Sequence, residues 1–212
     1  MTPSAHFRHL GALGGNQSDK SGHFASKDLF STILAFTMDS VFAIRDAVIE
    51  DAPAIARVNY LTWLHAYRGL IPDLELDSLN VESLTDNWKQ NLSIANPRIG
   101  IFVVTNSESI VAYSRFYPSV DPDDDRNRVA TIGSMYVDPE FQREGIGHNL
   151  MSVVLEAAKN CGFTEATLHV LAANTRAREF YEGLGWEKDS DADIEGSNEE
   201  TVPKVRYRKE PL

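Results

Sequence analysis

The sequence has one cysteine, no long apolar run and a shortage of positive charge. Because Cys161 is alone, the chain cannot form an internal disulfide, which fits a reducing cytosol. No apolar stretch approaches the roughly 18 residues of a membrane span, and the longest, residues 29–38, lies too far from the N-terminus to indicate a secretory signal. A formal net charge of −11 argues against general affinity for nucleic acid. These absences predict a cytoplasmic protein with neither a membrane nor a nucleic acid as partner.

The composition is that of one globular domain preceded by a different kind of segment. The 212 residues are 42% hydrophobic and 24% charged, enough for one well-buried core. Residues 1–39 are rich in Gly, Ser and His and lack periodicity, which predicts a disordered extension before a folded domain at 40–212. Alternatively, Met38 is the true start. A glycine-rich segment does not hold histidines in convergent geometry, so no metal site is expected.

The remainder of the chain alternates strand and helix patterns. Asp51 and Asn174 are the expected N-caps of the first and last helices, and acidic residues 189–200 are expected in a loop between the last two strands. The order predicts a mixed sheet with helices on its faces. Strands are expected at 41–45, 101–104, 110–116, 128–137, 166–171, 186–188 and 204–209, and helices at about 52–68, 81–93, 145–160 and 175–184.

The most informative segment is residues 136–147, Tyr-Val-Asp-Pro-Glu-Phe-Gln-Arg-Glu-Gly-Ile-Gly. A strand ends there, and two glycines open a strongly amphipathic helix. Glycine lets a ligand approach the backbone, and the first helical turn leaves N–H groups unpaired at the positive end of the helix dipole. Such a concavity suits a pyrophosphate, which an acidic protein must hold with local backbone donors. The same pattern also occurs at ordinary strand-to-helix connections.

Two blocks resemble the GNAT superfamily of N-acetyltransferases. Gln142, Gly145 and Gly147 match the signature Gln/Arg-x-x-Gly-x-Gly/Ala, and residues 174–186 are similar to the family's Asn-x-x-Ala-x-x-Phe-Tyr-x-x-x-Gly-Phe block. The resemblance covers about residues 41–209. It implies an α/β (α+β) fold in which helices flank a mixed, mostly antiparallel sheet with splayed central strands.

The resemblance also implies an activity. We expect an acetyl-CoA-dependent N-acetyltransferase that transfers the acetyl group to a primary amine by direct attack in a ternary complex, with acetyl-CoA as cosubstrate and no metal. A small-molecule acceptor is favoured. The alternatives are a protein or peptide N-acetyltransferase and a non-catalytic acyl-CoA sensor. The protein is expected to be a monomer or a homodimer.

Carried over by position, the family pattern assigns the cofactor site. Backbone groups from Arg143 to His148 would hold the pyrophosphate. Those of Met135 and Val137 would pair with the pantetheine arm, where one N–H would polarise the thioester carbonyl, and the Asn174 side chain would bond the same arm. The implied cofactor-binding set is Met135, Tyr136, Val137, Gln142, Arg143, Glu144, Gly145, Ile146, Gly147, His148, Asn174 and Tyr181.

The resemblance assigns the acid but leaves the base open. Tyr181 has the position of the family's usual tyrosine and would protonate the leaving thiolate, although a core tyrosine would fit the same helical stripe. Many relatives carry a glutamate on the fourth strand, where this sequence has Thr131. Water-mediated deprotonation assisted by Ser134, Tyr113 or Tyr136 is the expected substitute. Tyr181 and Ser134 are therefore the candidate catalytic residues.

The acceptor site has weaker signals. Residues 63–72 resemble a stretch common in small bacterial acetyltransferases of the family, where the first two helices border the acceptor. Trp63, Tyr67 and Arg68, together with Tyr113, are the expected substrate residues, and core packing explains Trp63 equally well. Acidic residues at 121–125 and 189–200 are either solvated or favour a cationic amine.

Overall fold

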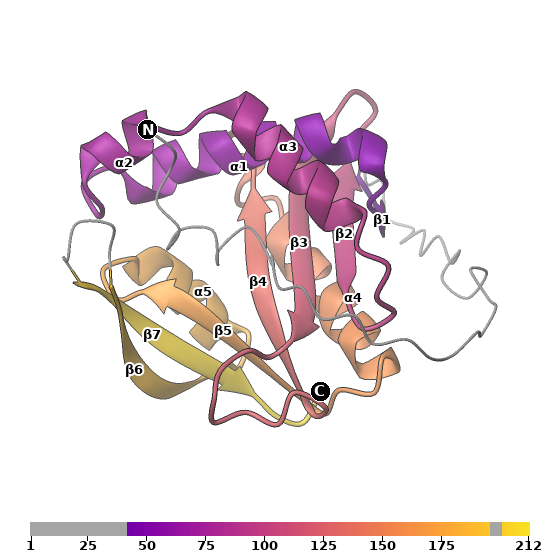
Figure 1. Cartoon of the computed structure of the whole chain (residues 1–212), viewed down its shortest axis with the longest axis vertical. Coiled ribbons are helices and arrows are strands. Elements are labelled where there is room, and N and C mark those ends of the chain that lie inside the picture. Colours follow the sequence, from indigo (N-terminus) through magenta and orange to yellow (C-terminus); the bar gives the residue numbers. More distant parts are fainter. Residues whose placement is uncertain (1–41, 196–200) are drawn as a thin grey trace.

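A single mixed sheet forms the centre of the molecule (Figure 1). The computed structural model describes residues 42–195 and 201–212, so the predicted extension 1–39 and the alternative start at Met38 lie outside the described residues. The seven strands follow the order β1-β2-β3-β4-β5-β7-β6, and only β4 and β5 pair in parallel. The predicted mixed, mostly antiparallel sheet is confirmed. The strands are β1 Ala43–Asp46, β2 Gly100–Thr105, β3 Ile110–Pro118, β4 Val129–Val137, β5 Glu165–Leu171, β6 Glu187–Glu195 and β7 Thr201–Lys209.

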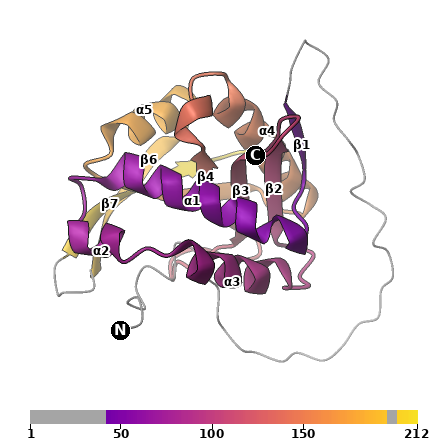
Figure 2. The same cartoon turned by 90° about the horizontal axis from the view of Figure 1, so that it is seen from above.

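Helices cover both faces of the sheet (Figure 2). One face packs Val103 and Tyr113 against α1 and α3, and the other packs Phe116 and Ile132 against α4. No helix in the described part of the chain is long and apolar enough to cross a membrane. The helices are α1 Ala52–Tyr67, α2 Asp73–Asp77, α3 Val81–Leu92, α4 Ile146–Asn160 and α5 Thr175–Gly183, with short 3-10 turns η2 Ile49–Asp51 and η3 Pro139–Phe141.

The structure differs from the sequence prediction in three places. Helix α2 was not predicted, because five residues are too few to show a helical period. Asp51 stands at the predicted N-cap position of α1, but its side chain makes no cap hydrogen bond to that helix; the carboxylate accepts from Val48 N–H and pairs with Arg45, at the 3-10 turn η2 that precedes α1. Strand β6 continues to Glu195 through residues expected in a loop.

The predicted splay of the central strands begins in the middle of β4. The β4–β5 ladder pairs Val129 with Glu165 and ends where Thr131 stands opposite Thr167. Two residues further on, the β3–β4 register skips Gly133. A Cβ atom there would lie 2.3 Å from the Tyr117 ring, so only glycine fits. The irregularity and the end of the ladder separate the second half of β4 from β5.

Candidate active site

A cleft of about 620 Å³ occupies the gap between β4 and β5. The last turns of α1, the loop before α4, the first turn of α4 and helix α5 complete its walls. Most residues implicated by the sequence line it, although they come from segments more than 100 positions apart. These residues are Tyr67, Ser134, Met135, Tyr136, Val137, Gln142, Arg143, Gly145, Ile146, Gly147, His148, Asn174 and Tyr181.

Four of the candidate residues lie elsewhere. Trp63 is buried beside the cleft in a cluster with Ile71 and Leu76, and Glu144 is exposed on the loop. Tyr113 is fully buried under α1 and α3, with its ring centroid 4.9 Å from that of Trp88. Arg68 is exposed and pairs with Asp73 and Asp77, each at 3.0 Å. None of the four is among the residues that line the cleft.

The loop between β4 and α4 is held by its own side chains. Asp138 is completely buried, caps η3 by accepting from Glu140 N–H, and lies 3.1 Å from Arg57 Nη1. The Gln142 side chain turns back to donate to Val137 O at 3.0 Å. Arg143 and Gly145 then adopt φ values of 72° and 78°, in the left-handed region that favours glycine. These contacts fix the direction from which the chain enters α4.

The first turn of α4 presents free N–H groups to the cleft. Asn149 N–H bonds to Gly145 O, but Ile146, Gly147 and His148 N–H have no acceptor among the described residues. They stand at the positive end of the helix dipole. A Cβ atom on Gly147 would lie 3.3 Å from the Phe180 ring, so glycine keeps α4 close to α5. The arrangement can bind a phosphate group through the backbone.

The open edge of β4 presents backbone groups to the same cleft. Asp138 N–H donates to Val111 O at 2.8 Å, and Val137 stands opposite Ala112. In an antiparallel pair, alternate residues direct their backbone groups to the partner strand. The backbone groups of Met135 and Val137 therefore point away from β3, toward the cleft. Val137 O accepts a hydrogen bond from the Gln142 side chain. Val137 N–H and the backbone N–H and C=O of Met135 remain available to a ligand.

Comparison with known proteins identifies the architecture. The sequence model described as "Acetyltransferase (GNAT) family" matches residues 62–186, which is more than half of the chain. The chain belongs to the GNAT acetyltransferase family. The matched range includes the cleft residues from α1 to α5.

Individual relatives agree with the family assignment. The chain is 27% identical over 132 residues to an uncharacterized N-acetyltransferase, YuaI, of Bacillus subtilis, covering 62% of this chain and 72% of the relative. It is 34% identical over 76 residues to bovine thialysine N-epsilon-acetyltransferase (36% and 44% covered). It is 37% identical over 57 residues to the ribosomal protein bS18-alanine N-acetyltransferase of Salmonella typhimurium (27% and 38% covered). The last two matches span less than half of those enzymes.

The fold is also found in a solved GNAT structure. PaiA N-acetyltransferase from Thermoplasma acidophilum, solved in complex with coenzyme A, superposes with a TM-score of 0.62 at 20% identity, covering 80% of this chain and 98% of that one. Shared fold and family make this chain a GNAT acetyltransferase.

Aromatic side chains line the end of the GNAT cleft next to α1. The hydroxyl oxygens of Tyr67 and Tyr136 lie 3.5 Å apart. Tyr181, on α5, packs edge-on against Phe180 and Trp186. Burial raises the pKa of all three tyrosines above the usual value of 10. Their hydroxyl groups are therefore protonated at neutral pH and available as hydrogen-bond donors.

Buried hydroxyl groups occupy the part of β4 where the family resemblance led us to look for a glutamate. Thr131 Oγ1 lies 3.3 Å from Thr167 Oγ1, inside the closed part of the β4–β5 ladder. The Ser134 hydroxyl is buried next to the Tyr113 hydroxyl, and a hydrogen bond between the two partly offsets the burial that raises the pKa of Tyr113. No carboxylate is among the cleft-lining residues of the described chain, whereas His65, His148 and His169 are. Sequence analysis did not select His169; its signal is one titratable residue within an apolar strand.

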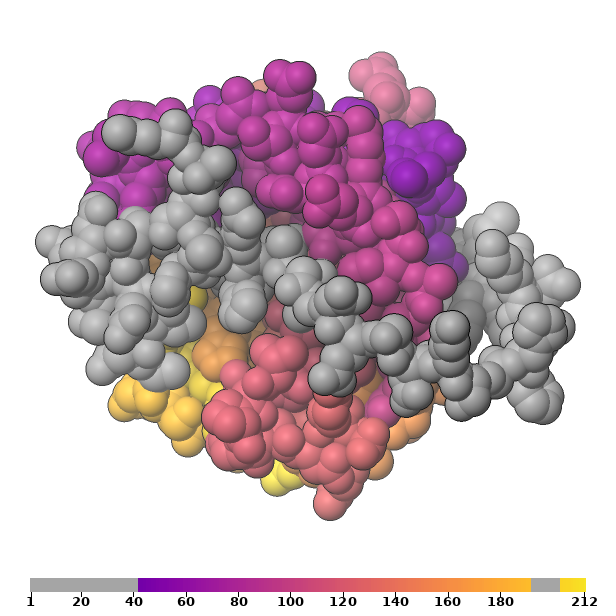
Figure 3. Space-filling view, in the orientation of Figure 1, coloured from indigo at the N-terminus to yellow at the C-terminus, as the bar shows by residue number. Residues whose placement is uncertain are grey.

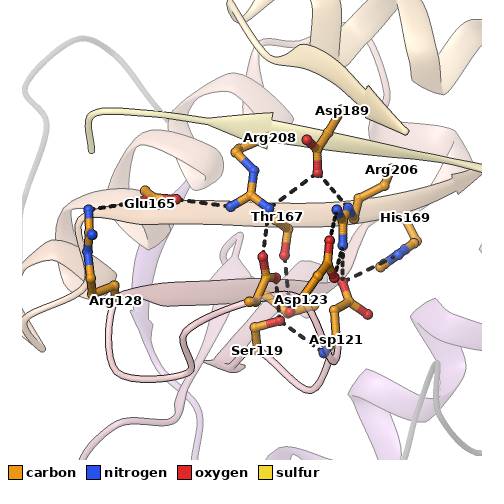
Figure 4. Close-up of polar contacts among 12 residues, drawn as sticks. Ser119, Asp121, Asp123, Arg128, Glu165, Thr167, His169, Asp189, Arg206 and Arg208 are labelled. Carbon is orange, nitrogen blue, oxygen red and sulfur yellow. Dashed lines mark hydrogen bonds and ion pairs between the residues drawn. The ribbon is translucent and has the colours of Figure 1, made fainter. Parts of the chain in front are cut away.

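Acidic residues of both segments form ion pairs with arginines of β7 (Figure 4), while residues 196–200 of the second segment lie outside the described residues. Arg206 contacts Asp123 and Asp189, and Arg208 contacts Asp124, Asp189 and Glu165. Asp189 stands at the register shift of the β6–β7 ladder, between Lys188 and Ser190. Asp123, Asp124 and Asp189 are therefore already neutralised by arginines, which does not favour a role for these three in attracting a cationic amine.

Proposed function

We propose that this GNAT acetyltransferase uses acetyl-CoA as its cosubstrate and transfers the acetyl group to a primary amine by direct attack in a ternary complex, with a small molecule as the favoured acceptor. The observation that carries the proposal is the open edge of β4 facing the first turn of α4. These two sets of backbone donors and acceptors line one cleft of about 620 Å³, a size suited to an extended ligand.

The phosphate end of the ligand would be held at α4. Ile146, Gly147 and His148 offer N–H groups that lack an acceptor among the described residues, and Arg143 lines the same part of the cleft. Each dipole interaction contributes only about 0.3–1 kcal/mol, but bonds from several N–H groups to charged oxygens add to it. Local donors of this kind explain how a chain of net charge −11 binds an anion.

The pantetheine arm would follow the open edge of β4. Met135 backbone groups and Val137 N–H are placed to pair with its amides, as an added strand would. Asn174 lines the cleft from the start of α5. Its side-chain oxygen accepts from Ala177 N–H at 3.1 Å, which leaves the amide NH2 group to bond the arm. A backbone N–H on β4 would polarise the thioester carbonyl.

Tyr181 would act at the sulfur. When the amine nitrogen attacks the carbonyl carbon, the C–S bond breaks and negative charge develops on sulfur. A thiol has an ordinary pKa near ~8.5, so a donor at this atom helps the thiolate leave. Tyr181 lines the cleft and its hydroxyl remains protonated at neutral pH, which fits the role of proton or hydrogen-bond donor.

Two alternatives keep specific support. The relatives include an enzyme named for thialysine and one named for a ribosomal protein alanine, so a peptide acceptor is the second candidate. A non-catalytic acyl-CoA sensor is the third candidate, because no carboxylate is among the described residues that line the cleft.

One assay separates these functions. The purified chain is incubated with acetyl-CoA and a panel of polyamines, amino acids, aminoglycosides and peptides while free thiol is measured. Release with small amines supports the proposal, and release with peptides alone supports the second candidate. Tight acetyl-CoA binding without release with any amine would indicate a sensor.

We further propose that residues 40–212 form the whole catalytic domain. A chain beginning at residue 40 should then match full-length activity, since the cleft residues span positions 62–181.

A further inference from the structure

His169 lies at the split in the sheet, on the face opposite α4. Side chains alternate along β5, so Ala166, Leu168 and Val170 face the core that α4 covers. His169 faces the other side, where it stands opposite Arg206 in the β5–β7 ladder. It also lines the cleft, and its side chain is 19% exposed. His169 therefore places a titratable group in the wall of the cleft, two residues beyond Thr167, where the β4–β5 ladder ends.

The Asp121 carboxylate faces the imidazole from the loop between β3 and β4 (Figure 4). His169 Nε2 lies 3.5 Å from Asp121 Oδ2, which is equally far from Arg206 Nη1. The loop is fixed locally, because Asp121 N–H donates to Ser119 Oγ, whose hydroxyl donates to Asp124. The space-filling view shows this part of the chain at the surface beside the C-terminal strands (Figure 3). Asp121 therefore approaches His169 from a loop that has hydrogen bonds of its own.

The surroundings keep the imidazole neutral. Burial is the main cause that lowers the pKa of His169 below 6.5, and the positive charges of Lys204 and Arg206 on β7 lower it further. The carboxylates of Asp121 and Asp124, from the β3–β4 loop, act in the opposite direction and do not reverse the shift. At neutral pH the side chain is therefore in its basic form, with a lone pair free to accept a proton.

We propose that His169 is the general base of the transfer and that Asp121 is its positioning residue. The assignment rests on the proposed function. It provides a general base in a cleft where no carboxylate is among the described lining residues. The amine nitrogen forms a bond to the carbonyl carbon and becomes acidic, and His169 accepts its proton. The C–S bond breaks, and the sulfur takes a proton from Tyr181. His169 then releases its proton to solvent and Tyr181 regains one, so the net products are the amide and free coenzyme A.

The test compares His169→Gln with the wild-type chain, using an amine that the acceptor panel identifies. We expect kcat to fall about 100-fold, while acetyl-CoA binding, measured by calorimetry, changes less than about threefold. The wild-type kcat at saturating amine should fall below pH 6.5 as the imidazole becomes protonated, and this acid limb should be absent from the variant. Added imidazole should restore part of the activity of His169→Ala, which a purely structural role would not allow.

Two further variants sharpen the result. Glu156→Gln is the control, because Glu156 is an exposed titratable residue of α4 that does not line the cleft; its kcat and pH profile should be unchanged. Asp121→Asn should move the acid limb to lower pH, since the carboxylate raises the pKa of His169. If the wild-type chain acetylates an amine and His169→Gln keeps its kcat and pH profile, the assignment is wrong and the proposed function stands. If the wild-type chain acetylates nothing, both are wrong.

Discussion

The hydroxyl oxygens of Tyr67 and Tyr136 lie 3.5 Å apart and connect the last turn of α1 to β4. Tyr67 also packs edge-on against Trp63, with 5.3 Å between ring centroids. The contact places a helix that borders the expected acceptor site directly beside the strand expected to hold the acyl donor. It therefore offers a means to separate binding of the acceptor from binding of acetyl-CoA.

Removing either hydroxyl should weaken binding of the acceptor amine more than binding of acetyl-CoA. A neutral hydrogen bond contributes about 0.5–1.5 kcal/mol, so Tyr67→Phe and Tyr136→Phe should each raise the KM for the amine up to roughly tenfold. The acetyl-CoA Kd should change little. Tyr60→Phe, on the same helix but outside the cleft, is the control. An equal rise in both constants would contradict the assignment of this end of the cleft to the acceptor.

Tyr181→Phe should lower kcat by about 10- to 100-fold, because the developing thiolate loses its hydrogen-bond donor. Its aromatic packing against Phe180 and Trp186 is retained, so the melting temperature and the acetyl-CoA Kd should stay close to wild type. Steady-state kinetics with thiol detection provide the measurement. An unchanged kcat would exclude Tyr181 as the acid and leave solvent in that role.

Gln142 is expected to act on the cofactor indirectly. Its side chain donates to Val137 O and so fixes the loop that leads into α4. In Gln142→Ala, loss of one such bond should weaken acetyl-CoA binding by about 1 kcal/mol, or roughly fivefold. The control is Gln90→Ala, at an exposed position of α3. Calorimetric titration would show whether the two variants differ, and identical Kd values would contradict the role of the loop.

Lys204 should make the protein less stable at neutral pH. The residue is buried, its ammonium group forms no ion pair with another described residue, and burial lowers its pKa from 10.5 to about 8. Between pH 8 and 10.5 the unfolded chain binds more protons, so stability should rise with pH across this window. Below pH 8 the buried charge lowers the free energy of unfolding by its full amount, on the order of 3 kcal/mol.

Lys204→Met should therefore raise the free energy of unfolding at pH 7 by on the order of 1–3 kcal/mol, and the gain should fade toward pH 10.5. Urea denaturation at several pH values measures it. Lys89→Met, at an exposed site on α3, is the control and should have little effect. A loss of stability at pH 7 would mean that the ammonium group has a favourable partner in solution.

Local features of the fold could be predicted from the sequence because they depend on neighbours along the chain. The apolar stripe of α4, the cap that Asn174 provides for α5, and the glycine-rich entry to α4 each involve residues within a few positions of one another. The GNAT resemblance also depends on such local blocks. For the same reason the sequence indicated most of the cofactor side of the cleft.

Contacts between distant segments were decided by the tertiary structure alone. Residues 121–124 meet Arg206 and Arg208 only because the β3–β4 loop folds under β7, and Tyr113 is withdrawn from the cleft only because α1 and α3 cover its face of the sheet. His169 acquires its carboxylate neighbour and its place in the cleft in the same way. By itself the sequence determined the family and the expected donor, because short motifs encode them. The partners of the acidic segments and the candidate base depend on packing between segments far apart in the chain, which periodicity and spacing do not reveal.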